Sequence, residues 1–130
     1  MDIQGHYTAN TTYFLPSADP CLLAILNSFL MTYFYKASYA VFRGGYLRFF
    51  EQYLRELPIA TCSDAKSHEK IASLADQMHR LHKRLQTANT DHDRTILQRQ
   101  ITATDKQIDN LVYKLYGLTK EEIAIVEANA

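Results

Sequence analysis

The sequence lacks an excess of charge of either sign. Its 130 residues contain 14 lysines and arginines and 14 aspartates and glutamates. The balance is also zero in each half, with four basic and four acidic residues up to Thr61 and ten of each after it. A chain without net charge has no overall field that would attract nucleic acid or an acidic membrane, so any such binding must be local.

Cysteine is scarce, and a long apolar run is missing. Cys21 and Cys62 lie far apart without a Cys-x-x-Cys or Cys/His spacing, which argues against a zinc site or a disulfide scaffold and favours reduced thiols. No basic leader precedes an apolar run at the N-terminus. The most apolar stretch, residues 21–35, is interrupted by three polar residues and is too short to span a bilayer comfortably. These features predict a cytoplasmic protein without a membrane partner.

Catalytic motifs are missing as well. The chain has no glycine-rich phosphate loop opening a helix, no Gly-x-Ser-x-Gly and no His-Glu-x-x-His. His79 and His82 are three apart and could share a helix face, but a third metal ligand is not evident. Solvated side chains in the basic patch of residues 79–84 are the better interpretation. We therefore predict no catalytic residue, no metal and no cofactor in this chain.

Two segments in the second half, within residues 71–115, carry apolar residues at alternating spacings of three and four. This spacing is typical of helices with one apolar stripe. The first stripe contains Ile71, Leu74, Met78, Leu81 and Leu85, and the second contains Leu97, Ile101, Thr104, Ile108, Leu111 and Leu115. A short polar break at residues 87–91 folds the helices antiparallel. At roughly 30 and 40 Å they are long for so small a domain, so we predict a projecting coiled-coil hairpin. Two helices of an ordinary bundle are the alternative, because Thr104 weakens the second stripe.

Local signals mark the ends of these helices. Asn89 is expected to adopt a left-handed turn that ends the first helix, and Thr90 is expected to cap the second together with Asp93. Gly117 is expected to end the second helix. Residues 119–122, Thr-Lys-Glu-Glu, form a capping box for a short last helix, which should fold back onto the rest of the chain.

The first sixty residues contain one strong helix signal and two weak strand signals. Asp19 and Pro20 predict the start of a helix that runs to about Lys36 and is apolar nearly all round, hence buried. Residues 11–15 form a weak strand signal, and residues 53–59 alternate apolar with polar side chains and contain a proline suited to a strand edge. The predicted fold class is therefore mainly α with a small β component (α+β).

Aromatic and basic residues gather between Phe29 and Tyr53, where ten of the fifteen aromatic residues lie. At the centre, two adjacent glycines lie between arginines. They indicate a turn, or a loop whose main chain closely approaches another backbone or a partner. In one interpretation the aromatic side chains are core and the arginines are solvated. In the other, arginine, tyrosine and exposed glycine backbone face nucleic acid.

Four ordered segments match a known family. They are residues 22–28 (LLAILNS), 43–50 (RGGYLRFF), 52–59 (QYLRELPI) and 108–127 (IDNLVYKLYGLTKEEIAIVE). Together they resemble the C-terminal end of the TaqI-like target-recognition domain, which closes many adenine-specific DNA methyltransferases and type IIG restriction-modification enzymes. The similarity runs from about Tyr13 to Glu127.

The resemblance implies a DNA-recognition module whose partners are double-stranded DNA and an upstream methyltransferase domain. That domain would flip out an adenine and methylate it from S-adenosylmethionine. By analogy with the long helices of type I specificity subunits, the hairpin would be a spacer. The residues predicted to lie near DNA are Lys36, Arg43, Gly44, Gly45, Tyr46 and Arg48, with Arg43 and Arg48 as phosphate contacts. Secondary phosphate contacts are predicted at Arg80, Lys83 and Arg84.

The chain also departs from the family pattern. The Asn-Pro-Pro-Tyr and cofactor-binding motifs and most of the first half of the recognition domain are absent, so we expect a C-terminal fragment that cannot catalyse alone. The expected parts are a portion of the recognition domain (1–61), the hairpin as spacer and docking arm (62–117) and a short C-terminal helix (118–130). The alternative function is a structural module without DNA contact that forms a homodimer through the hairpin.

Overall fold

The computed structural model describes residues 17–39, 50–61 and 64–129, which form helices and contain no strand. The helices are α1 (Pro20–Leu26), α2 (Phe29–Ser38), α3 (Glu51–Arg55), α4 (Ala65–Thr87), α5 (Asp91–Tyr116) and α6 (Lys120–Asn129). The predicted α+β class is therefore wrong: the regular structure in the described part of the chain consists of helices alone. The strand signal at residues 11–15 lies outside the described residues.

The strand predicted at residues 53–59 is replaced by α3 and an extended tail. Glu51 and Arg55 are four residues apart and form an ion pair along α3, with 3.1 Å between the Arg55 Nε and the carboxylate, and such a pair favours a helix. The tail pairs with a side chain instead of a strand. The Tyr116 hydroxyl donates to the Pro58 carbonyl (2.7 Å) and accepts from the Ala60 N–H (3.0 Å). A short apolar alternation without a neighbouring strand is too weak a signal to specify a sheet.

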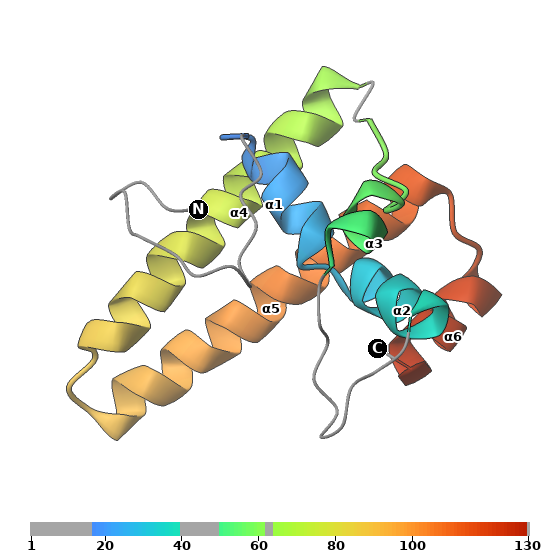
Figure 1. The fold of residues 1–130 in the computed structure, drawn as a ribbon. Coiled ribbons are helices and arrows are strands. Elements are labelled where there is room, and N and C mark those ends of the chain that lie inside the picture. Colours follow the sequence, from blue (N-terminus) through green and yellow to red (C-terminus); the bar gives the residue numbers. More distant parts are fainter. Residues whose placement is uncertain (1–16, 40–49, 62–63, 130) are drawn as a thin grey trace.

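The helix predicted from Asp19 to about Lys36 is two helices. Its start is confirmed, because the Asp19 carboxylate accepts from the Cys21 N–H (2.9 Å) and Pro20 is the first helical residue. Ser28 then breaks the run: its hydroxyl donates to the Ile25 carbonyl (2.7 Å) and accepts from the Met31 N–H (3.3 Å). The break separates the directions of α1 and α2 (Figure 1).

The predicted burial of this segment on all sides is wrong in part. Leu23 in α1 and Phe29 in α2 remain 39% and 43% exposed. On the two sides of the break the helices pack differently: α1 packs against α4, whereas α2 packs against α5 and α6. Each of the two short helices therefore buries one side only.

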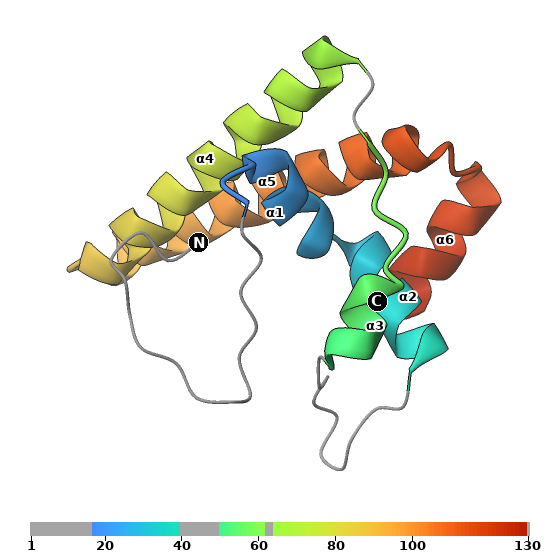
Figure 2. The same ribbon diagram turned by 45° about the horizontal axis from the view of Figure 1, so that its top comes forward.

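The predicted hairpin is confirmed as a pair of helices that pack on each other. With 23 and 26 residues, α4 and α5 are about 35 and about 39 Å long. They approach each other near residues 88–90 and diverge toward their other ends, where α1 lies against them (Figures 1 and 2). The loop half of the hairpin consequently lies away from α2, α3 and α6. Its coiled-coil geometry stays a prediction.

The caps of the hairpin follow the sequence signals with one exception. Thr90 accepts from the Asp93 N–H (3.0 Å), and Gly117 ends α5 in the left-handed conformation, with φ of 68°. Thr119 and Glu122 bond reciprocally at the start of α6, at 2.8 and 3.3 Å. The left-handed turn predicted for Asn89 is wrong, because no non-glycine residue in the described part has a positive φ. The chain leaves α4 through an extended Ala88 instead.

The core lies where α1, α2, α4 and α5 meet. Its buried members are Cys21, Ala24, Ile25, Met31, Ile71, Ala75, Ile108 and Val112. At the far end α6 turns back against α2, and its Val126 is buried, as predicted for the last helix (Figure 2). Among the described helices, none combines the length and the apolar character needed to cross a membrane.

Candidate nucleic-acid interface

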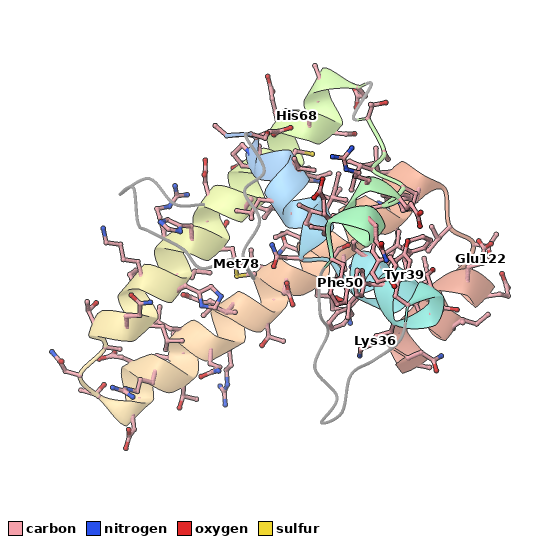
Figure 3. All side chains as sticks on the ribbon, viewed as in Figure 1. Lys36, Tyr39, Phe50, His68, Met78 and Glu122 are labelled. Atoms are coloured by element: carbon pink, nitrogen blue, oxygen red, sulfur yellow. The ribbon has the colours of Figure 1, made fainter. Side chains whose placement is uncertain are left out.

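The predicted primary contacts fall in the segment of the sequence between α2 and α3. Arg43, Gly44, Gly45, Tyr46 and Arg48 lie in residues 40–49, outside the described residues. The flanking residues are described: Tyr39 caps the end of α2, and Phe50 caps the start of α3. Lys36 is exposed in the last turn of α2, one helical turn before Tyr39. Figure 3 shows these three residues at the end of the molecule formed by α2, α3 and α6.

Four aromatic side chains join the described residues on the two sides of residues 40–49. We call Tyr35, Tyr39, Phe50 and Tyr53 the aromatic clasp. The rings of Tyr39 and Tyr53 stack with their centroids 4.1 Å apart and their planes 19° apart. Tyr35 lies 4.9 Å from Tyr39, and Phe50 meets Tyr53 edge to face at 5.7 Å. Such pairs contribute about 1 kcal/mol each beyond the area they bury, so the clasp holds the start of α3 to the end of α2.

Polar contacts strengthen the clasp. The Tyr39 hydroxyl donates to the Glu56 carboxylate at 3.0 Å. Burial, followed by this bond, raises the pKa of Tyr39. Burial also raises the pKa of Tyr35, which is almost fully enclosed and hydrogen-bonds to the Phe50 backbone. Both phenols therefore stay neutral in ordinary buffers, and these rings serve packing instead of charge recognition.

The predicted secondary contacts divide between two faces of α4. Arg80 and Arg84 line a groove of about 410 Å³ between α4 and α5, whereas Lys83 is exposed and does not line it. His79 and His82 line a different groove, of about 590 Å³, beside Leu23 of α1. The described residues contain no group of three His, Cys, Asp or Glu that could hold a metal ion.

One polar pair beneath α2 has no counterpart in the sequence predictions. The carboxylate of Asp109 accepts from the Phe29 N–H at 2.9 Å, so α5 caps the start of α2 from outside that helix. Burial is the main reason that the pKa of Asp109 rises to about 6. Burial also raises the pKa of Tyr113 to about 12, and its hydroxyl has no hydrogen-bond partner among the described residues. The only feature of the sequence that could have suggested this buried pair is an aspartate directly beside the apolar stripe.

The clasp was not predicted either. The spacing of Tyr35 and Tyr39, four residues apart in a helical segment, could have suggested one ring contact. The contact with Tyr53 crosses a loop, and the sequence contains no pattern that specifies it. Only the arrangement of α2 and α3 brings these rings together.

A comparison with models of protein families gives one match. The family model described as the TaqI-like C-terminal specificity domain matches residues 1–59, which confirms the resemblance for that part of the chain. The match includes α1, α2, α3 and the whole 40–49 loop, and it ends before α4. Similarity from there to Glu127 stays a prediction. No curated protein and no solved structure was found to match. The family indicates DNA sequence recognition in a restriction-modification protein.

Proposed function

We propose that this chain is a specificity fragment of a restriction-modification DNA methyltransferase and that it positions the enzyme on its recognition sequence. The observation that carries this proposal is the match of residues 1–59 to the TaqI-like C-terminal specificity domain. Catalysis is assigned to an upstream methyltransferase domain of the same protein, which would bind S-adenosylmethionine and modify adenine. The parent enzyme is proposed with or without a fused endonuclease, so the type IIG arrangement is one of its two forms.

The aromatic clasp supports the segment of residues 40–49 as the contact with DNA. Because Tyr39 and Tyr53 stack, the described residues on the two sides of this segment lie close together. Arg43 and Arg48 lie between these ends in the sequence, and Lys36 is exposed just before them. Arginine binds phosphate or guanine through two parallel hydrogen bonds, and adjacent glycines allow the main chain to approach the duplex.

The hairpin of α4 and α5 is the proposed spacer and docking arm. Its loop half lies away from α2 and α3 (Figures 1 and 2), so it is placed to contact another part of the enzyme or more of the duplex. Helices of about 35 and about 39 Å suit this role, since a helix holds its two ends a fixed distance apart.

A binding experiment with the Arg43→Ala plus Arg48→Ala variant tests the proposal. We expect weaker binding to the cognate duplex, measured by fluorescence anisotropy in the full-length enzyme. The slope of log K against log salt should fall in magnitude by about 1.8, since each phosphate contact contributes about 0.9. The charge-matched control is Arg99→Ala plus Lys114→Ala, which removes two exposed basic residues of α5. Equal affinity and slope for the test variant and the unmodified enzyme would contradict the assigned loop.

The alternative is a dimerisation module. It requires apolar surface on the hairpin. There Leu81 and Leu97 are each only 5% exposed, whereas Ile96 of α5 is 40% exposed. Sedimentation is the deciding measurement: a concentration-dependent dimer together with no DNA binding by the intact protein would favour this alternative.

A further inference from the structure

A polar groove runs along one face of the hairpin. It occupies about 410 Å³ between the last turns of α4 and the middle of α5. Six polar residues line it: Gln77, Arg80, Arg84, Gln100, Thr104 and Gln107. We call it the hairpin groove. No described acidic residue lines it, so its charge is positive although the chain as a whole is neutral.

The two arginines reach the hairpin groove from successive turns of α4. They are four residues apart, which places them about 6 Å apart along the helix axis. Both are exposed, and within the described residues neither guanidinium makes an ion pair or a hydrogen bond. Their hydrogen-bond donors are therefore available to a ligand. Lys83 lies between them in the sequence but does not line the groove.

The other walls add neutral donors. The Thr104 hydroxyl donates to the Gln100 carbonyl (2.8 Å) and accepts from the Gln77 side-chain amide (3.4 Å). Thr104 is buried, so it holds this part of the wall in place. The side-chain amides of Gln100 and Gln107 stand on the α5 side. Two arginines facing amide donors form a site for an extended anion and not for a cation.

We propose that the hairpin groove binds the sugar–phosphate backbone of double-stranded DNA, independently of base sequence. The inference rests on the proposed function and adds a second contact to it. A duplex fits because guanidinium groups one helical turn apart can contact neighbouring phosphates of one strand, each through paired N–H groups. None of the described residues that line the groove is aromatic, so they offer no platform on which bases could stack.

The test compares the full-length enzyme with its Arg80→Ala plus Arg84→Ala variant on a cognate and an unrelated duplex across a salt series. Fluorescence anisotropy should show weaker binding to both duplexes by the same factor, and a slope of log K against log salt smaller in magnitude by about 1.8. The Arg80→Lys plus Arg84→Lys variant keeps the charge but loses the paired geometry. It should keep the slope and bind less tightly.

The control is Lys66→Ala plus Lys70→Ala, which removes the same charge from exposed positions of the same helix outside the groove. It should change the slope less than the arginine variant. Alanine has the highest helix propensity, so α4 should stay folded, and circular dichroism checks this. If the alanine variant does unfold, the lysine variant decides, since undiminished affinity there would refute the proposed paired contacts.

Four results overturn the inference in distinguishable ways. If the chain binds DNA but Arg80→Ala plus Arg84→Ala leaves the salt slope unchanged, the groove proposal fails and the proposed function stands. An equal loss in the lysine control would assign the effect to general charge and would also refute the groove. If the unmodified full-length enzyme binds no duplex at all, both proposals fail. A loss restricted to the cognate duplex contradicts the proposed sequence independence.

Discussion

Asp109 offers the sharpest test of the packing around α2. Its carboxylate is 4% exposed and accepts one hydrogen bond from the Phe29 N–H. Burial raises its pKa, the Phe29 bond opposes this, and the nearby carboxylates of Asp105 and Glu127 raise it further, to about 6. The Asp109→Asn substitution keeps an oxygen for the Phe29 N–H and removes the charge. It therefore separates the cost of burying the charge from the value of the cap.

The sign of the pH dependence follows from the direction of the shift. Because the pKa in the folded chain lies above the ordinary value of 3.8, the folded state binds this proton more tightly. Its contribution to stability is fully present below about pH 4 and is lost as the pH rises through about 6. A difference of about two pH units corresponds to about 3 kcal/mol. At neutral pH the Asn variant should therefore be more stable than the unmodified chain by up to about 3 kcal/mol.

The assay is urea denaturation followed by circular dichroism at several pH values. The advantage of Asp109→Asn should be largest near pH 8 and should vanish near pH 4, where the Asp109 carboxyl is protonated. Asp76→Asn, at an exposed position of α4, is the control. Asp109→Leu should be less stable than Asp109→Asn by about 1 to 3 kcal/mol, because the Phe29 N–H loses its acceptor. An Asn variant whose advantage does not change with pH would refute the reasoning.

Two further substitutions test other parts of the fold by the same denaturation assay. Gly117→Ala should lower the free energy of unfolding by about 1 kcal/mol, since φ is 68° and a Cβ would meet no atom within 4 Å, so only backbone strain acts. Gly117→Asn should lose less, and equal stability of Ala and Gly would contradict the left-handed cap. Tyr53→Leu should cost about 1 kcal/mol and speed hydrogen exchange in α3, because the stack with Tyr39 is lost. Tyr53→Phe keeps the ring and should behave like the unmodified chain.

Helix ends and apolar stripes could be predicted because they depend on neighbours in the sequence. Thr90, Gly117 and Thr119 act on backbone groups within a few residues, so their roles follow from residue type and spacing. The stripes of α4 and α5 likewise follow from a helical period and the need to cover apolar side chains. The Asn89 prediction failed because a left-handed turn is only one of several ways to end a helix.

The errors lie where distant contacts decide between local alternatives. The alternating residues 53–59 could form a strand only beside another strand, and none is present in the described part of the chain. Instead the tyrosine stack holds α3, and the Tyr116 hydroxyl satisfies the backbone that follows. Ser28 can interrupt a helix because its hydroxyl hydrogen-bonds to the backbone. Whether the helix breaks there is decided by the packing of α1 on α4 and of α2 on α5 and α6.

The sequence by itself determined the hairpin, its caps and the resemblance to a DNA-specificity family, because periodicity, turn chemistry and motifs are local properties of a chain. Only the tertiary structure decided which basic residues share a surface. Arg80, Lys83 and Arg84 form one patch in the sequence, yet the packing of α4 on α5 gives a groove to the two arginines and leaves the lysine outside it. The same packing buries Asp109 against α2. Both outcomes depend on which faces of separate helices meet. The spacing of residues along one helix does not specify which face of another helix it will contact.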